Sequence, residues 1–240
     1  MQIVSLSLFR FDTASARLWA LGMMGAARLS LPRHEGLTFW KLCGSGSGEG
    51  FTPIPNTGVY AILAVWQDAA TAERQLAASS LWARYRARAA EDWTLFLSPI
   101  SARGRWSGAE PFAAGTDTQA GPIAALTRAT VRPARAARFW RRQPDISRRI
   151  GSDPNVLFKI GIGEVPFLQQ VTFSIWPDVD SMARFARSSG PHARAIRAVR
   201  EGGWFREELY ARFRIHGETG SWEGQSPRIL VPPLPQEQCA

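Results

Sequence analysis

His192 is the residue in this chain with the clearest potential for chemistry. It lies one position inside a helix that Pro191 is suited to begin, because the fixed backbone angle of proline fits the first turn. Ala195, Ile196 and Val199 follow it at spacings of three, four and seven residues, so the imidazole shares an apolar stripe of that helix. A buried imidazole needs partners for its two nitrogens. The pattern therefore predicts either a hydrogen-bonded core histidine or a ligand to a metal or haem.

The rest of the sequence contains few residues that could bind the same metal ion as His192. The other two histidines, His34 and His216, are expected in a solvated turn and at the surface end of the last strand. No HExxH, CxxC or paired-histidine spacing occurs, so a zinc or non-haem iron site would need ligands from distant segments. Haem needs only one protein ligand, because the porphyrin supplies the other four. A single histidine on an apolar stripe therefore suits haem better than a bare metal ion.

A haem pocket at this helix would draw on a small set of neighbouring side chains. The candidate cofactor-binding residues are His192, Arg194, Ile196, Arg197, Trp204 and Phe205. The two arginines could form bidentate pairs with haem propionates, or they could face water. The two aromatic residues follow a glycine pair and could form a wall of the pocket, or they could pack in the core. No catalytic residue beyond the metal ligand is predicted.

Signatures of nucleotide binding and hydrolysis are absent from the sequence. The glycine-rich stretch at 44–50 lacks the Lys-Ser/Thr of a P-loop and does not match the G-x-G-x-x-G of dinucleotide-binding proteins. No G-x-S-x-G motif supplies a hydrolase nucleophile. The stretch is followed by Pro53 and Pro55, and it is predicted to be a plain loop between two strands.

Charge and cysteine content restrict the partners and the compartment. The 240 residues carry a formal net charge of +9, with 29 basic and 20 acidic side chains. No helix-turn-helix, zinc finger or RNA-binding aromatic motif accompanies the arginines, so nucleic acid is not an expected partner, whereas a peripheral contact with an anionic membrane is. Two cysteines are too few for a disulfide framework, which favours the cytoplasm. No apolar run reaches the roughly 18 residues that a membrane-spanning helix needs.

The chain is predicted to consist of two similar halves. In the first half, periodicity predicts strands at 2–11, 37–43, 58–66 and 93–100 and helices at 15–30 and 68–90, the β-α-β-β-α-β order of a ferredoxin-like unit. The second half repeats short stretches of the first in the same order. The matching pairs are Leu18-Trp19 with Phe139-Trp140, Trp40-Lys41-Leu42 with Phe158-Lys159-Ile160, Trp66-Gln67-Asp68 with Trp176-Pro177-Asp178, and Trp106-Ser107-Gly108 with Trp222-Glu223-Gly224.

The predicted fold class is α+β, with tandem ferredoxin-like repeats packed as a dimeric-type α/β barrel within one chain. We assign residues 1–108 to the first repeat, 109–122 to a linker, 123–224 to the second repeat with the proposed haem site, and 225–240 to a proline-rich tail. The offset of 110 residues that pairs Trp66 with Trp176 also pairs Trp82 with His192. Only the second half has a metal-binding atom at this position, and this asymmetry favours the ligand hypothesis.

Long stretches of the chain resemble a known enzyme family. Residues 39–66, 86–112 and 203–215, which contain FWKLCGSGSGEGFTPIPN, DWTLFLSPI and GWFREELYARF, are similar to the bacterial spheroidene monooxygenases, the carotenoid 2-ketolases of purple phototrophs. The resemblance implies haem b as cofactor, O₂ as co-substrate and reduced ferredoxin as electron donor. It implies oxygenation at C-2 of spheroidene-type carotenoids, giving the 2-hydroxy and then the 2-oxo product, spheroidenone. The expected location is cytoplasmic, peripheral to the inner or photosynthetic membrane.

Two other functions remain open at the level of the sequence. A haem-dependent dehydratase or peroxidase on the same barrel would retain His192 as a ligand but would need no ferredoxin. A cofactor-free barrel, either of the antibiotic-monooxygenase type or one that only binds a ligand, would use His192 for packing alone.

Overall fold

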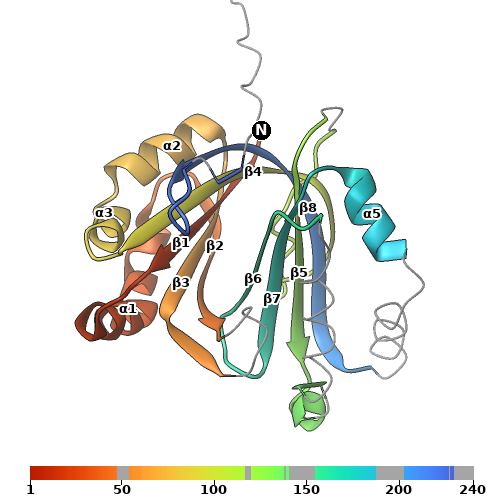
Figure 1. Cartoon of the computed structure of the whole chain (residues 1–240), viewed down its shortest axis with the longest axis horizontal. Helices are drawn as coiled ribbons and strands as arrows, with labels where there is room; N and C mark the ends of the chain where they lie inside the picture. The colour runs from red at the N-terminus through yellow and green to blue at the C-terminus, as the bar shows by residue number, and fades with distance from the viewer. Residues whose placement is uncertain are drawn as a thin grey trace, which may run out of the picture.

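The computed structural model of the 240-residue chain describes residues 1–47, 54–116, 120–137, 139–140, 155–187, 203–226 and 228–229. Its centre is a closed antiparallel barrel with the strand order β1-β3-β2-β6-β7-β5-β8-β4 (Figure 1). The strands of the first half are consecutive in the order β4-β1-β3-β2, because β4 pairs with β1 and closes the barrel. The strands of the second half are consecutive in the order β6-β7-β5-β8. The α+β barrel predicted from the sequence is therefore confirmed.

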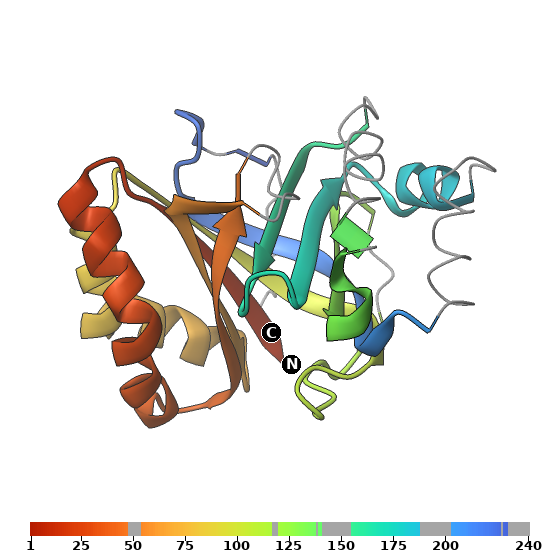
Figure 2. The same ribbon diagram turned by 90° about the horizontal axis from the view of Figure 1, so that it is seen from below.

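The first half of the chain supplies four strands with helices between them. Its elements are β1 (Ile3–Arg10), α1 (Ala14–Ala26), the 3₁₀ turns η1 (Ala27–Leu29) and η2 (Leu31–Arg33), β2 (Leu37–Gly46), β3 (Pro55–Trp66), α2 (Ala69–Ala78), α3 (Ser80–Arg86) and β4 (Glu91–Gly104). α1 begins where the Thr13 hydroxyl accepts a hydrogen bond from the Ala16 amide, the usual N-cap arrangement. The helices lie on the outer side of this part of the barrel (Figures 1 and 2).

The second half follows the same plan. Its elements are β5 (Ile123–Val131), β6 (Phe158–Gly163), β7 (Gln169–Trp176), α5 (Val179–Arg187) and β8 (Phe205–Gly220), and residues 133–137 and 139–140 are helical. Asp178 caps α5 by accepting a 2.6 Å hydrogen bond from the Ser181 amide, and Asp68 caps α2 through the Thr71 amide at 2.8 Å. The repeated Trp-x-Asp stretch is therefore the end of a strand followed by a helix cap.

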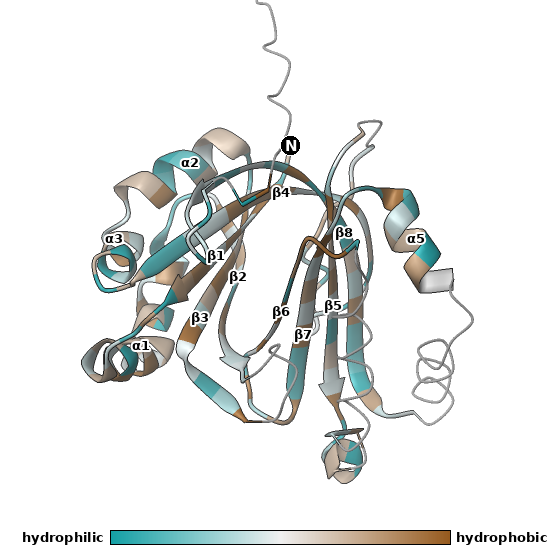
Figure 3. Ribbon diagram, in the orientation of Figure 1, coloured by the Kyte–Doolittle hydropathy of each residue, from teal (hydrophilic) through white to brown (hydrophobic). Residues whose placement is uncertain are grey.

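Alternation along the strands separates the two faces of the barrel wall. The largest cluster of buried apolar side chains fills the interior and includes Leu6, Trp93, Leu126 and Phe173. Residues between these face outward, and Figure 3 shows hydrophobic and hydrophilic positions alternating along β5 and β7. Because side chains fill the interior, as in other small barrels, a large ligand has more room on an outer face than inside the wall.

The helix predicted at 68–90 is two helices rather than one. Ser79 separates α2 from α3 because its backbone is extended, with ψ at 123°. The Ser79 hydroxyl then accepts a 3.1 Å hydrogen bond from the Leu81 amide and so caps α3. The apolar periodicity of the sequence runs across this break, which is why periodicity alone predicts a single helix.

The match of Trp40 with Phe158 is displaced by one residue. Phe158 belongs to the interior cluster, whereas Trp40 packs on the outer face of the first half. In the ladders, Trp40 lies opposite Ala64 and Lys159 lies opposite Ser174, so Lys159 is the equivalent of Trp40. Adjacent residues in a strand face opposite sides, so a one-residue error exchanges the two faces.

The beginning of the predicted tail is attached to the barrel. The amides of Arg228 and Ile229 donate hydrogen bonds to the Glu218 carboxylate at 3.1 and 2.7 Å, and Ile229 is buried in the interior cluster. The boundaries assigned to repeats, linker and tail stay predictions. In the parts of the chain that the structure describes, no helix is both long enough and apolar enough to cross a membrane.

Candidate functional site

The six residues predicted to bind a cofactor fall into two groups. Those outside the described residues are His192, Arg194, Ile196 and Arg197. Trp204 is buried and Phe205 is half-buried at the start of β8, and both pack with Val131 and Phe139. The structure therefore brings the two aromatic candidates together, while the roles of the other four stay predictions.

The strand registers define which outward-facing residues of the two halves are equivalent. β1 and β3 pair Ile3 with Trp66, and β5 and β7 pair Ile123 with Trp176. In each ladder, every second residue pair after this one also faces outward. The outward pairs of the first half are Ser5–Ala64, Ser7–Ile62 and Phe9–Tyr60, and those of the second half are Ala125–Ser174, Thr127–Thr172 and Ala129–Gln170.

The two outer faces differ most at the pair farthest from these tryptophans. Phe9 and Tyr60 are buried aromatic residues, and the ring of Phe9 lies 4.8 Å from that of Tyr85 in α3. Ala129 and Gln170 occupy the same pair in the second half. One half therefore fills its outer face with rings that pack beneath helices, and the other half replaces them with smaller or polar side chains.

The next pair along the face shows the same change across the neighbouring strand. In the first half, Ile62 lies opposite Leu42, and both are buried in the outer cluster. In the second half, Thr172 lies opposite Gly161. A branched side chain and a leucine are thus replaced by a threonine and a residue without a side chain, so the side chains at these positions are smaller in the second half.

Thr127 marks the centre of this outer face. Its equivalent Ser7 is fully buried and accepts hydrogen bonds from Trp82 Nε1 at 3.2 Å and Thr94 Oγ1 at 2.8 Å. Thr127 is exposed. Trp82 covers the sheet in the first half, and its sequence equivalent is His192. Ser7 and Thr127 therefore differ in exposure, and the sequence equivalent of the side chain that covers Ser7 lies outside the described residues.

Gln170 adds a polar requirement to the same place. Its side chain is buried, and within the described part of the chain neither its amide oxygen nor its amide nitrogen has a hydrogen-bond partner. The oxygen of the adjacent Gln169 side chain also lacks a partner among these residues. Buried polar groups are normally paired, because an unpaired one costs free energy. A ligand with a polar edge would provide the missing partners.

Aromatic side chains close one end of this face. Val131 follows Ala129 on the outer side of β5 and packs with Phe139 and Trp204. The ring of Phe139 lies 5.8 Å from that of Phe205 and 5.3 Å from that of Trp140. These rings form an apolar boundary next to the smaller residues of the sheet.

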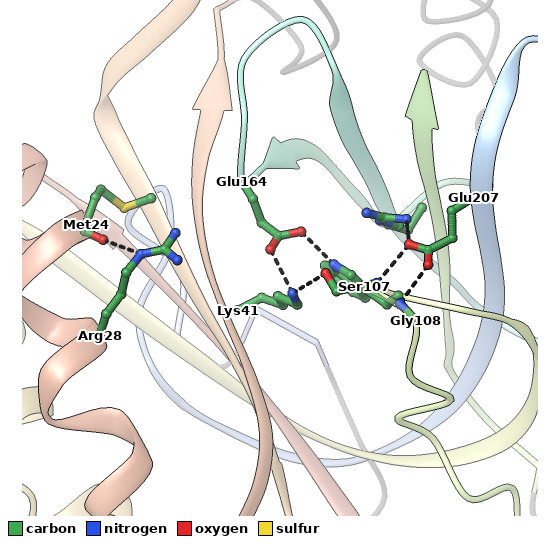
Figure 4. A network of polar contacts seen from close by, with 9 residues as sticks. Met24, Arg28, Lys41, Ser107, Gly108, Glu164 and Glu207 are labelled. Carbon is green, nitrogen blue, oxygen red and sulfur yellow. Dashed lines mark hydrogen bonds and ion pairs between the residues drawn. The ribbon is translucent and has the colours of Figure 1, made fainter. Parts of the chain in front are cut away.

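A charged network lies on the inner side of the wall, near the same end of β5. Lys41 Nζ is 2.9 Å from Glu164 Oε1 and donates a 2.7 Å hydrogen bond to Ser107 Oγ (Figure 4). Trp106 Nε1 donates to Glu164 Oε2 at 2.6 Å, and the guanidinium of Arg128 lies 5.7 Å from the Trp106 ring centroid. Lys41 and Glu164 come from different halves, so their ion pair joins the halves.

Glu207 holds one of the two repeated turns in place. It accepts hydrogen bonds from the amides of Ser107 at 2.8 Å and Gly108 at 2.7 Å, and it forms an ion pair with the buried Arg128 (Figure 4). Burial acts to raise the pKa of Glu207, but the two backbone hydrogen bonds and the charge of Arg128 outweigh it and hold this pKa below its usual value. Glu207 is thus ionised at neutral pH.

Glu91 does the same for the other repeated turn. It accepts hydrogen bonds from the amides of Gly224 at 2.7 Å and Glu223 at 3.0 Å, and it pairs with Arg10 at 2.8 Å. Glu223 and Ser107 share a φ of 55°, so the two tripeptides adopt the same turn. Because the first half repeats the arrangement around Glu207, that arrangement is a feature of the fold and does not mark a catalytic site.

The remaining titratable residues in the described part of the chain have structural contacts. Among the described residues, no three His, Cys, Asp or Glu side chains gather closely enough to hold a metal ion. Cys43 is buried in the interior, where desolvation and the charge of Glu164 raise the pKa of its thiol.

The prediction of a solvated His34 is wrong: Nε2 forms a 2.8 Å hydrogen bond with Ser79 Oγ, and the ring lies edge-on to Trp82 at 5.3 Å. His216 lies inside β8 and forms a 2.7 Å hydrogen bond with Ser98 Oγ.

The outer-face residues were not singled out by the sequence analysis, although a usable signal was present. The 110-residue offset of the tryptophan match also aligns Tyr60 with Gln170 and Ile62 with Thr172. Ala129 is harder to find, because it is 120 residues after Phe9 and β5 is displaced relative to β1 in the repeat.

Comparisons with known proteins identify the fold and the family. No family model matches the chain. An aldoxime dehydratase crystallised with butyraldoxime superposes with a TM-score of 0.58 at 12% identity, over 89% of this chain and 79% of that one, and a second aldoxime dehydratase structure gives 0.57 at 12% identity. These structures share the fold.

Curated proteins are similar over nearly the whole chain. Spheroidene monooxygenase of Cereibacter sphaeroides is 54% identical over 231 residues, which cover 95% of this chain and 71% of that protein. The same enzyme of Rhodobacter capsulatus is 51% identical and covers 95% of both chains, and that of Rubrivivax gelatinosus is 35% identical over 92% of this chain and 85% of the other. The chain therefore belongs to the spheroidene monooxygenase family and is a monooxygenase.

Proposed function

We propose that this monooxygenase uses haem b and O₂ to oxygenate C-2 of spheroidene-type carotenoids, with reduced ferredoxin as the electron donor. The first product is the 2-hydroxy carotenoid and the second is the 2-oxo carotenoid, spheroidenone. The observation that carries the haem site is the outer face of β5 and β7, where Ala129 and Gln170 stand in place of Phe9 and Tyr60. The shared name of the relatives supports a carotenoid as the substrate.

The sizes of the side chains on this face support a porphyrin. The equivalent face of the first half is filled by aromatic rings, whereas Thr127 and Ala129 in β5 are smaller, and this difference supports a large flat group at the second face. The exposed Thr127 lies at its centre. Among the residues that the structure describes, the buried amide of Gln170 has no partner, and its nitrogen could donate a hydrogen bond to a propionate.

The proposed ligand and its neighbours come from the segment after α5. His192 would supply the axial nitrogen, Arg194 and Arg197 would pair with the propionates, and Ile196 would pack against the ring. Trp204 and Phe205 would form the aromatic wall that they already make with Phe139. When bound, haem supplies the activation of O₂ that inserts one oxygen atom into a C–H bond.

Side chains of this face also suit an apolar substrate. The outward residues of β5 and β7, from Ile123 to Val131 and from Gln170 to Trp176, include no ionised group. A polyene end can therefore approach Thr127 without removing water from a charge, which would cost several kcal/mol, of the order of 5 or more. The aromatic wall excludes water from the same end.

The reaction balances as two rounds of one oxidation. In each round a C–H bond at C-2 breaks and a C–O bond forms, while the second oxygen atom of O₂ leaves as water. Ferredoxin provides two electrons and solvent provides two protons. The first round gives the alcohol, and the second gives a geminal diol that loses water to become the ketone.

An absorption spectrum of the purified protein tests the haem site directly. We expect a Soret band that is lost in His192→Ala and restored in His192→Gly by added imidazole, because imidazole replaces the missing ligand. His216→Ala is the matched control and should retain the band, since His216 in β8 is hydrogen-bonded to Ser98 in β4. Full haem content and activity in His192→Ala would refute the assignment.

Turnover separates the remaining functions. With reduced ferredoxin and O₂, the protein should convert spheroidene to the hydroxy and then the oxo product, and it should do neither without the reductant. Conversion of a substrate without reductant would instead indicate a haem-dependent dehydratase or peroxidase. A colourless protein that gains no Soret band when haem is added would indicate a cofactor-free barrel.

A further inference from the structure

We propose that the hairpin tip between β6 and β7 is the surface through which the protein contacts an anionic lipid bilayer. The tip consists of Val165, Pro166 and Phe167. The inference rests on the proposed function, which requires a substrate that is dissolved in the membrane, and it names the part of the protein that meets the lipid.

The tip presents apolar side chains to solvent. Val165 is 42% exposed and Phe167 is 52% exposed, although large apolar residues are usually buried. Phe167 also has a φ of 66°, in the left-handed region that residues other than glycine rarely adopt. A strained backbone that holds an aromatic ring outward points to a use for that ring at the surface.

Hydrogen bonds hold the tip in this conformation. Trp140 Nε1 donates to the carbonyl oxygen of Phe167 at 2.8 Å, and the Gln169 amide donates to that of Val165 at 3.0 Å. The Val131 amide at the end of β5 donates to the Leu168 carbonyl at 2.7 Å. The tip is thus fixed to β5 and to the helical residues after it, and it can enter a bilayer without a further ordering cost.

A further aromatic ring adjoins the tip. The Trp140 ring lies 6.4 Å from that of Phe167, and tryptophan is a residue that favours the membrane–water interface. The exposed Val165 and Phe167 therefore lie beside a residue type that is common at bilayer surfaces.

The charges around the tip match an anionic surface. Arg132 and Arg135 are exposed, and among the described residues neither forms an ion pair. Glu164, the carboxylate next to the tip, points inward to Lys41 and Trp106 and is mostly buried. Apolar residues flanked by unpaired arginines are the pattern of proteins that bind the interface of anionic bilayers.

The tip adjoins the proposed active site. Phe167 is three residues before Gln170, and Trp140 is in the aromatic cluster with Phe139. With the tip in the headgroup region, the outer face of β5 and β7 would begin at the lipid surface. The end of a carotenoid could then reach that face without crossing bulk water.

A second exposed apolar surface provides the matched control. Leu18 is 71% exposed and Leu21 is 56% exposed on α1, which covers the first half of the barrel on the side away from α5 (Figures 1 and 2). If exposure alone caused lipid binding, α1 would bind at least as well as the tip.

Sedimentation with lipid vesicles tests the proposal. Vesicles of phosphatidylcholine containing phosphatidylglycerol should bind the wild-type protein at low salt, and high salt should weaken binding. Val165→Ser with Phe167→Ser should lower the partition coefficient at least about tenfold, because two apolar side chains are lost from the interface. Leu18→Ser with Leu21→Ser should stay within about twofold of wild type, and Arg132→Glu with Arg135→Glu should reduce binding only to the anionic vesicles.

The opposite pattern would overturn the proposal. It fails if the wild-type protein does not bind these vesicles, if the tip variant binds as wild type does, or if only the α1 variant loses binding. Should the tip variant fold poorly, a polarity-sensitive dye on Phe167→Cys in a Cys239→Ser background provides the second measurement, since Cys43 is buried. A blue shift on adding vesicles supports the proposal, and an unchanged spectrum refutes it. Vesicle binding by a protein without haem would preserve this inference even if the proposed chemistry fails.

Discussion

Ala129 in β5 occupies the position that Phe9 occupies in β1. Phe9 lies opposite Tyr60 in its ladder, and Ala129 lies opposite Gln170 in the equivalent ladder. The two halves thus share a backbone plan and differ in what fills the outer face. Under the proposed function, the cofactor binds the face that lacks the rings.

Filling the second face should block the cofactor. Ala129→Phe places in β5 the ring that β1 already carries, so we expect haem content to fall by at least about tenfold while the free energy of unfolding changes by less than about 2 kcal/mol. The Soret absorbance per chain and a denaturant titration measure the two quantities.

Emptying the first face should have the reverse effect. Phe9→Ala removes a fully buried ring and should cost about 3–5 kcal/mol of stability, yet the folded fraction should load haem normally. If Ala129→Phe retained full haem content, the outer face of β5 and β7 would not be the cofactor site.

Replacing Glu207 should destabilise the protein at neutral pH more than at acid pH. The folded pKa of Glu207 lies below its usual value of 4.5, so its contribution to stability is complete above that value and declines as the pH falls through the folded pKa. Glu207→Gln should cost about 2–4 kcal/mol at pH 7, because the buried Arg128 loses its charged partner. The difference from wild type should shrink below pH 4.5 in urea titrations.

Glu91→Gln is the matched control for that experiment. Its partner Arg10 is considerably more exposed than Arg128, so the cost should be smaller, about 1 kcal/mol, with the same direction of pH dependence. Equal costs for the two variants would contradict the importance of burial at Arg128.

Cys43 should resist thiol reagents in the folded state. Its pKa is raised by burial and by Glu164, so little thiolate forms at pH 8 and the sulfur is not accessible. In Cys239→Ser protein, Ellman's reagent should label no cysteine under native conditions and one per chain in denaturant. Rapid native labelling would show that the barrel interior opens readily near Cys43.

Ser79→Ala should lower stability by about 1 kcal/mol, the usual cost of losing an N-cap. The same hydroxyl bonds to His34, so the variant also leaves His34 Nε2 without this partner. Ser80→Ala, one residue further and not a cap, is the control and should be nearly neutral in thermal unfolding.

Much of the fold follows from local patterns in the sequence. The strand positions, the doubling of the chain and the barrel follow from alternation, from apolar periodicity and from the Trp-x-Asp match, since these features are set by neighbouring residues. The break at Ser79 and the true equivalent of Trp40 do not, because a cap and a register depend on which groups meet in space.

The candidate site divides in the same way. The sequence shows His192 on an apolar stripe, and it shows that the equivalent position of the first half is Trp82. The Gln170 amide, which has no partner among the described residues, and the exposed Thr127 emerge only when the strands are paired, because neither residue type is unusual in a strand by itself. The outward Phe167 likewise depends on a backbone angle that composition does not reveal.

The unequal closure of the barrel has a consequence for its motions. β4 and β8 are joined by eleven residue pairs, whereas in the described part of the chain β2 and β6 share only Gly44–Gly163 and Ser45–Ile162. Thermal fluctuations should break the short β2–β6 pairing first, while the long β4–β8 pairing keeps the two halves together. Amide protons of Ser45 and Ile162 would then exchange with solvent far sooner than those along β4, and the hairpin that carries Phe167 would sit on the more yielding side of the cylinder.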